Sequence, residues 1–449
     1  MPGSRCVLVA IIGLNCAQSA RTEFEDLSAA DQATLRSLAP AVLPAPPPDA
    51  SNRFADDARA ARFGQRLFFD KAFSGRLLDG DNDGSPTTLG VKGEAGKVAC
   101  AGCHVPSAGF LDDRTLGKQI SLAASWSLRR TPSLLDVGQA RLLMWDGRRD
   151  ALYNQPFGPV ESEKEMNSSR LFVAEQIAAR YAVEYQQLFG PLPPMSNASR
   201  FPPVDAAHTG CDSIAGTSPP PVCHGMPNDH AEYDGMSPVD QAAVTQVVAN
   251  VGRALGAYQR LLTCGQGRFD RWVNGDATAL NASEKRGAVV YIGKGKCIGC
   301  HSGPFFTDQQ FHNVGLAPAK VAVVFIDMGD RGAGQGLAAA LSDPLNVRGK
   351  YSDGDDGRLP KVLSATLEGA FRTPSLRCVA RRPSLMHTGQ VATLEEAVAF
   401  FDRGGHPAGY PGKSELYPLG LTDRERADLV AFLRTLEGPG PAQLLLTTP

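Results

Sequence analysis

The chain has 449 residues, which is enough for about two or three domains with their own hydrophobic cores. Its 45 Lys and Arg residues nearly balance its 47 Asp and Glu residues, so the formal net charge is −2 at pH 7. This balance gives no reason to expect a nucleic acid or an anionic membrane surface as a partner.

The first 20 residues predict an export signal. Arg5 is followed by an apolar run over residues 7–14 and then by small residues, which is the pattern of a signal peptide. The run is too short to span a bilayer, and we expect no transmembrane segment. Cys16 is an alternative site of lipidation, but Gly13-Leu14-Asn15 before it is a poor lipoprotein sequence.

Residues 21–54 form a Pro-rich N-terminal segment, in which a short helical pattern precedes a run of prolines that favours an extended polyproline conformation. The segment 56–69 is a better helix, because Ala60, Phe63 and Leu67 fall on one helical face.

Helical patterns dominate the rest of the chain. They recur at 175–189, 239–262, 282–292, 394–401 and 422–436. The Gly- and Asp-rich segment 77–98 and the Pro-rich segment 191–236 predict loops. Because alternating strand patterns are scarce, we expect a mostly α fold with long loops between the helices.

The most specific feature is a Cys-x-x-Cys-His motif that occurs twice. Two thiols at this spacing can attach to the two vinyl groups of one porphyrin, and the adjoining histidine is then held over the iron as its proximal ligand. A lone Cys-x-x-Cys would also suit a redox dithiol or half a zinc site, but a histidine adjoins both copies. We therefore predict two covalently bound haem c groups. Their cysteines are Cys100, Cys103, Cys297 and Cys300, and their iron ligands are His104 and His301.

The surroundings of the two motifs are also repeated. Arg-Thr-Pro-Ser-Leu occurs at 130–134 and 372–376, and a distinctive side chain, Trp145 or His387, stands fourteen residues beyond each motif threonine. We predict two cytochrome c-like haem domains related by internal duplication. They span 55–275, with a Pro-rich insertion at 191–236, and 276–437, followed by a tail at 438–449. Two haems indicate redox chemistry, and bacteria attach haem to such motifs outside the cytoplasm, so we expect a periplasmic protein.

Six of the ten cysteines lie outside the haem motifs. Two of these, Cys6 and Cys16, fall in the predicted signal. The other four can form two disulfides in an oxidising compartment, with three alternative pairings; they are Cys211, Cys223, Cys264 and Cys378. We favour a bond between Cys211 and Cys223, because both lie in one loop. A third haem is not expected at Cys223-His224, since Pro220 stands where another cysteine would be needed.

Taken in order, the motifs resemble those of the bacterial di-haem cytochrome c peroxidases and their MauG-like relatives. The resemblance covers residues 55–437. Its matching segments are Gln-Arg-Leu-Phe-Phe-Asp at 65–70, both haem motifs, Arg-Thr-Pro-Ser-Leu at 130–134, Trp-Asp-Gly-Arg at 145–148, 158–160 with 165–166, 311–315, and 386–387 before 393–395.

The resemblance implies that the first haem reacts with peroxide. Cleavage of the O–O bond needs an open face on the iron and a group that accepts a proton from HOOH and returns it. In the family, a glutamine and a glutamate stand ten and twenty residues after the tryptophan, and here Gln155 and Glu165 stand at those distances from Trp145. The alternative is that Glu165 belongs to an exposed acidic helix start with Glu161 and Glu163.

The tryptophan of this family lies between the haems as an electron relay, which a low ionisation energy suits. For Trp145 the alternative is a buried aromatic residue in a core. His387 occupies the equivalent position in the second half, where it is either a supporting group near the haem or a core histidine.

The chain departs from the family pattern at both irons. Many family members rest with a histidine on the first iron, but residues 105–130 contain none, and Trp126 in that loop is no iron ligand. The first haem is therefore expected to be open when oxidised, as in MauG-like members. At the second haem, Phe401 stands where the family has a methionine or tyrosine ligand. We expect either five-coordinate iron or a substitute ligand, with Met386 and His406 as candidates.

Two segments of the sequence bear on calcium binding, and each lacks an expected ligand. The inter-haem calcium of the family uses an asparagine that Arg130 replaces here, and Arg382 and Ser384 fall in the second calcium-binding stretch. A cationic side chain could substitute electrostatically for the ion. Separately, residues 79–84 match the first half of a calcium loop, but Gly90 stands where a glutamate ligand belongs, so a solvated loop is the preferred interpretation.

The expected function is the reduction of hydrogen peroxide at the first haem, with electrons passed through the second haem from a small cytochrome c or a cupredoxin. One alternative is a MauG-like enzyme that uses peroxide to oxidise a side chain of a partner protein. Another is a non-catalytic di-haem electron carrier, which would need two closed, six-coordinate irons.

Overall fold

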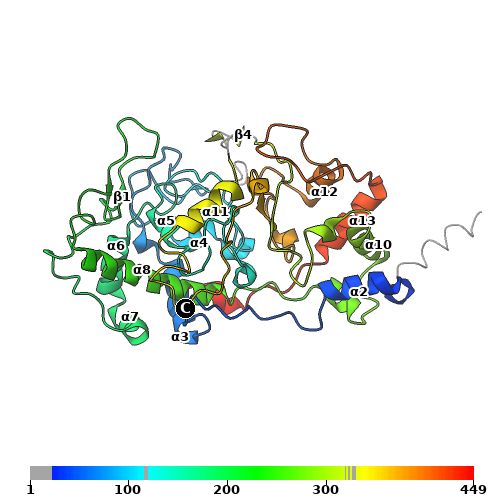
Figure 1. Ribbon diagram of the computed structural model, residues 1–449, viewed down its shortest axis with the longest axis horizontal. Coiled ribbons are helices and arrows are strands. Elements are labelled where there is room, and N and C mark those ends of the chain that lie inside the picture. The colour runs from blue at the N-terminus through cyan, green and yellow to red at the C-terminus, as the bar shows by residue number, and fades with distance from the viewer. Residues whose placement is uncertain (1–22, 116–119, 319, 322–323, 326–329) are drawn as a thin grey trace, which may run out of the picture.

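One pair of closely packed helices organises each half of the chain (Figure 1). In the N-terminal half, α3 (Ala58–Phe69) lies against the long helix α8 (Pro238–Gln259). In the C-terminal half, α10 (Ala282–Ile292) lies against α13 (Asp423–Arg434). The computed structural model describes residues 23–115, 120–318, 320–321, 324–325 and 330–449, so the predicted export signal lies outside the described residues.

Both helix pairs cross at a glycine. A Cβ atom on Gly64 of α3 would lie 1.9 Å from the carbonyl oxygen of Ala254 in α8. A Cβ atom on Gly287 of α10 would lie 2.0 Å from the carbonyl oxygen of Asp428 in α13. No side chain fits at such distances, so glycine is what lets the two backbones approach. The same device in both halves agrees with an internal duplication.

Most predicted helices are present. Asp57 caps α3 by accepting hydrogen bonds from the backbone N–H groups of Arg59 and Ala60. The predicted helix over 175–189 is instead two helices: α6 ends before Tyr181, and α7 begins after it. The remaining α-helices are α2 (Ala29–Leu38), α4 (Cys100–Cys103), α5 (Phe157–Glu161), α6 (Arg170–Arg180), α7 (Ala182–Phe189), α9 (Arg268–Val273), α11 (Ala333–Ser342) and α12 (Leu394–Asp402). Short 3-10 helices cover Phe24–Asp26, Lys71–Phe73, Pro106–Ala108, Val137–Gln139, Cys297–Gly299, Ala365–Leu367, Val379–Arg381 and Gln443–Leu445.

The described residues contain only three short antiparallel sheets, each of two strands. The pairs are β1 (Gly210–Cys211) with β2 (Cys223–His224), β3 (Phe311–His312) with β6 (Phe371–Arg372), and β4 (Lys320–Val321) with β5 (Val324–Phe325). No helix or regular strand occurs within 77–98. The prediction of a mostly α fold with long loops is confirmed.

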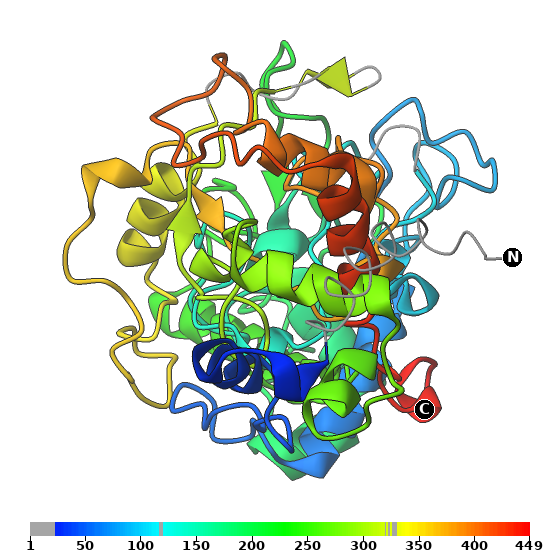
Figure 2. The same ribbon diagram turned by 90° about the vertical axis from the view of Figure 1, so that its right-hand side faces the viewer.

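Each half of the chain has its own large hydrophobic core. Two helices, α2 and α11, pack in the core of the other half. The N-terminal helix α2 packs in the C-terminal core, where Phe24 meets Trp272 edge to face at a centroid distance of 5.4 Å. Figure 2 shows α2 on the surface of the C-terminal half, next to α10. Conversely, α11 contributes Ala333 and Leu337 to the N-terminal core. Each core therefore takes residues from both sides of residue 275.

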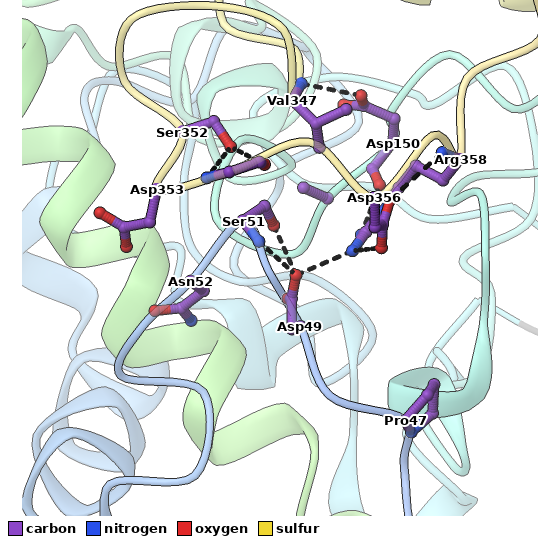
Figure 3. A network of polar contacts seen from close by, with 12 residues as sticks. Pro47, Asp49, Ser51, Asn52, Asp150, Val347, Ser352, Asp353, Asp356 and Arg358 are labelled. Atoms are coloured by element: carbon purple, nitrogen blue, oxygen red, sulfur yellow. Dashed lines mark hydrogen bonds and ion pairs between the residues drawn. The ribbon is translucent and has the colours of Figure 1, made fainter.

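The proline-rich segment after α2 runs back to the N-terminal half and is anchored by polar contacts. Arg260 at the end of α8 donates to the carbonyl oxygen of Pro47 at 2.9 Å. Asp49 accepts hydrogen bonds from Ser51 at 2.6 Å and from Arg358 at 2.8 Å, as Figure 3 shows. The N-terminal segment thus ties both halves together.

Four cysteines form two disulfides. Cys211 is bonded to Cys223 across the β1–β2 pair, which is the favoured pairing within one loop. Cys264 is bonded to Cys378 over a sequence separation of 114 residues, so this bond joins the two halves of the chain. The four cysteines of the haem motifs are free, as attachment of haem requires.

Candidate active site and two haem cavities

The first haem motif lines a cavity of about 500 Å³ in the N-terminal half. Cys100, Cys103 and His104 line it together with apolar side chains such as Phe68. The Nδ1 atom of His104 lies 3.1 Å from the carbonyl oxygen of Phe110. This contact occupies one ring nitrogen and leaves Nε2 for a metal. Burial lowers the pKa of His104 to about 4, so the imidazole is neutral, as an iron ligand must be.

The second motif repeats this arrangement in the C-terminal half. Cys297, Cys300 and His301 line a cavity of about 580 Å³. The Nδ1 atom of His301 lies 2.9 Å from the carbonyl oxygen of Phe306, and burial lowers the pKa of His301 to about 4. Phe306, like Phe110 in the first half, has a positive φ, which turns its carbonyl group toward the histidine. In both cavities, two free thiols, a pre-oriented neutral histidine and an apolar lining fit haem c.

The two repeated arginine motifs cross over between the halves. The backbone N–H of Arg130 donates to the carbonyl oxygen of His387 at 2.8 Å, and the backbone N–H of Arg372 donates to that of Trp145 at 2.8 Å. Each motif therefore bonds to the residue fourteen positions beyond the threonine of the other motif. This reciprocal pairing places the equivalent residues of the two halves around one shared wall.

Trp145 lies in this wall and lines both cavities. Its indole Nε1 donates to the carbonyl oxygen of Arg130 at 2.7 Å. The His387 ring lies 6.4 Å from the Trp145 ring and stacks on Phe371 at a centroid distance of 3.5 Å. Burial lowers the pKa of His387 to about 3, so this ring is neutral. His387 lines only the second cavity.

The predicted peroxide-handling residues line the first cavity. Gln155 and Glu165 are both in its wall, and the Gln155 amide nitrogen lies 3.8 Å from the sulfur of Met144. Burial raises the pKa of Glu165, against the opposing effect of Arg148. Among the described residues, no cation lies within 4 Å of the Glu165 carboxylate.

The neighbouring acidic residues are arranged differently from Glu165. Glu161 pairs with Arg170 at 2.6 Å and Glu163 pairs with Lys164 at 2.6 Å, and neither lines the first cavity. Glu165 is thus separated from Glu161 and Glu163, with which the alternative interpretation grouped it in an exposed acidic helix start. Apart from His104, no histidine of the described residues lines this cavity.

The residues proposed as sixth ligands of the second haem differ in position. Phe401 and Met386 line the second cavity, whereas His406 does not. The Nδ1 atom of His406 accepts a hydrogen bond from the backbone N–H of Ala317 at 2.9 Å, and its ring packs on Phe400 at 5.3 Å. Of the two candidates, Met386 alone is at the cavity.

The acidic loop at 79–84 uses its carboxylates within the protein. Asp79 accepts from the Ser125 hydroxyl at 2.9 Å, and Asp81 accepts from the Trp126 indole at 2.9 Å. Trp126 is therefore turned to this loop and does not line the first cavity. These bonds favour a structural loop over a calcium site.

Sequence reasoning noted Arg130 and Arg382 only at the calcium-binding positions, and it missed that they line the haem cavities together with Arg372. Arg372 and Arg130 line both cavities, and Arg382 lines the second. The signal was present, because arginine opens the repeated motif in both halves. Arg129 also lines the first cavity, but it forms ion pairs with Asp146 and Asp330, both at 2.6 Å.

Comparison with known proteins gives one family. The model of the di-haem cytochrome c peroxidase family matches residues 58–209. The methylamine utilization protein MauG of Methylorubrum extorquens is 31% identical over 355 residues, which cover 78% of this chain and 76% of that protein. The cytochrome-c peroxidase IdrP1 of Denitromonas iodatirespirans is 29% identical over 419 residues, covering 92% and 90%.

Solved structures agree in fold. A MauG-like protein associated with microbial copper homeostasis matches with a TM-score of 0.57 and 23% identity, covering 91% of this chain and 96% of that one. The diheme peroxidase BthA from Burkholderia thailandensis matches with a TM-score of 0.58 and 22% identity, covering 89% and 96%. At this identity the likeness concerns the fold alone. Within the described part of the chain, no helix is long and apolar enough to cross a membrane.

Proposed function

Because the chain belongs to the di-haem cytochrome c peroxidase and MauG family, we propose that it reduces hydrogen peroxide in the first cavity, with Glu165 as acid and base. One observation carries this proposal: Glu165 and Gln155 both line the cavity that holds His104. A haem held by Cys100, Cys103 and His104 would supply the iron at which peroxide is reduced.

Glu165 moves the proton. With haem bound, its carboxylate would accept one proton of H₂O₂ and return it to the oxygen that leaves as water. With two electrons and two further protons, the balanced reaction converts one H₂O₂ to two molecules of water. The pKa of Glu165 is raised by burial, which suits a group that must both accept and donate a proton near neutral pH. The Gln155 amide orients the oxidant.

Trp145 connects the two cavities in this proposal. Its ring is in the wall of both, and its Nε1 hydrogen bond to Arg130 holds it there. Electrons enter at the second cavity from a small cytochrome c or a cupredoxin and reach the first cavity through this side chain. The expected compartment is the periplasm.

A second candidate is the oxidation of a side chain of a partner protein, with peroxide as the oxidant. Two observations favour it: the first cavity has no second histidine among the described residues, and Phe401, which cannot ligate iron, lines the second cavity. The third reading, a non-catalytic carrier, requires two closed irons, which these features do not favour.

The test is a stopped-flow spectrum of the fully oxidised protein mixed with one equivalent of hydrogen peroxide. We expect a fast spectral change without prior reduction. Glu165→Gln should slow it roughly 10²–10⁴-fold, the usual contribution of an acid/base group, with both haems retained. Glu163→Gln is the matched control, since it removes the same charge outside the cavity lining. Equal rates in all three proteins would remove Glu165 from the mechanism.

The same experiment separates the two candidate functions. Turnover with a reduced small cytochrome c supports the peroxidase, whereas a long-lived oxidised spectrum that only a protein partner discharges supports side-chain oxidation. A wild-type protein that reacts only after one haem is reduced would show that its first iron is closed at rest.

A further inference from the structure

Three arginine side chains line the wall that separates the two cavities. Arg130 and Arg372 are exposed to both cavities, and Arg382 only to the second. Arg130 is 3% exposed to solvent. Enclosure lowers the pKa of each of the three guanidinium groups to about 10. The charges of Arg130 and Arg372 further lower the pKa of Arg382, and Asp136, which also lines the second cavity, opposes this effect. Three like charges therefore lie close together in a place with little water.

The protein itself offers little compensation for two of these charges. Among the described residues, no carboxylate lies within 4 Å of Arg372 or Arg382. Arg372 donates to the carbonyl oxygen of Met144 at 3.3 Å, and Arg382 donates to that of Ser375 at 2.5 Å. Arg129 in the same wall shows the contrast, because two carboxylates lie 2.6 Å from it. Burying a cation without a counter-charge is unfavourable, because the ion loses its hydration without a compensating interaction.

A ligand that brings carboxylates into the cavities would supply the close counter-charge that Arg372 and Arg382 lack. A porphyrin of the haem type carries two propionate carboxylates at one edge, and a guanidinium can bind a carboxylate through two parallel hydrogen bonds. Each cavity is lined both by the two cysteines of its haem motif and by arginines of this wall.

We propose that Arg130, Arg372 and Arg382 form one anion-binding wall that holds the propionates of both haems. Arg130 and Arg372 serve both groups, and Arg382 serves the second alone. The two propionate edges then face the same cations, with Trp145 fixed beside them by its bond to the Arg130 carbonyl oxygen. This binding requires attached haem but does not depend on peroxide turnover, so it can stand if the proposed reaction fails.

The consequence is measurable at each iron separately. A guanidinium beside a propionate offsets its negative charge, which favours the reduced, less positive iron. Removing the guanidinium should lower the midpoint potential of every haem it serves. A tenfold loss in the ratio of reduced to oxidised haem corresponds to 59 mV for a one-electron couple, and we expect about this change per lost charge.

The experiment is a potentiometric titration of the purified di-haem protein, in which electron paramagnetic resonance separates the two ferric signals. Arg382→Gln should lower the midpoint potential of the second haem by about 59 mV, which is a tenfold loss in the ratio of reduced to oxidised haem. The midpoint potential of the first haem should stay unchanged. Arg372→Gln should lower both. Arg331→Gln is the charge-matched control, because Arg331 is exposed, pairs with Glu368 and lines neither cavity. It should move neither potential.

Lysine variants separate the loss of a charge from a failure of the protein to fold. Arg372→Lys and Arg382→Lys keep the charge, so both haems should be retained with potentials near those of the wild type. Equal shifts of both haems in Arg382→Gln, no shift in either glutamine variant, or a lysine variant that behaves like its glutamine counterpart would each overturn the proposal.

Discussion

Replacing either crossing glycine with alanine should weaken one half of the protein and its own haem site. In Gly64→Ala the new methyl carbon would lie 1.9 Å from the Ala254 carbonyl oxygen, whereas real Cβ contacts are essentially never closer than 3.0 Å. The pair α3 and α8 must therefore separate by more than 1 Å. Because the obstacle is backbone, no side-chain rotation can relieve it.

The size of the effect follows from two opposing contributions. Overpacking of a filled interior costs about 1–3 kcal/mol, and the rigid obstacle places this change at the upper end. Alanine in a helix is better than glycine by about 1 kcal/mol. The free energy of unfolding should thus fall by about 2 kcal/mol, measured by denaturant titration. Gly80→Ala is the control, since no atom lies within 4 Å of its added Cβ, and it should stay within about 0.5 kcal/mol of the wild type.

The two halves offer an internal comparison. Phe68 of α3 lines the first cavity, and Tyr291 of α10 lines the second, where its hydroxyl donates to the His301 carbonyl oxygen at 2.5 Å. Gly64→Ala should perturb the spectrum of the first haem and Gly287→Ala that of the second. A Gly64→Ala protein as stable as the wild type, or a perturbation of the opposite haem, would refute the reasoning about the helix crossing.

Three further predictions concern the site. Because burial raises the pKa of Glu165 and only the carboxylate accepts a proton, the rate of reaction with peroxide should fall as pH drops through this raised pKa; a wild-type profile identical to that of Glu165→Gln would contradict this. Trp145→Phe should slow electron transfer between the haems by at least tenfold in flash or stopped-flow kinetics while both haems stay bound, and transfer at the full rate would make Trp145 merely structural. Chelation of calcium should leave the haem spectra and the peroxide rate unchanged, since Arg130 stands at the place of a calcium ligand; a loss that added calcium restores would show a functional ion.

Local patterns predicted the elements that depend on neighbours in sequence. The helix at 282–292 begins and ends at the predicted residues, because its apolar spacing and its Asn281 cap are both local. The single helix predicted over 175–189 was wrong, since Tyr181 has non-helical backbone angles and separates α6 from α7. The short helices α9 and α11 were not predicted, because their packing partners are remote in sequence.

The sequence by itself determined the two haem positions, since two cysteines and a histidine within five residues define a porphyrin attachment wherever the chain runs. It also determined the spacing of Trp145, Gln155 and Glu165. Only the tertiary structure decided that Trp145 lines both cavities and that Arg372 and Arg382 lie in the same wall as Arg130. It also decided that Cys264 pairs with Cys378. These outcomes depend on how two halves more than a hundred residues apart pack together, and no local spacing encodes that contact.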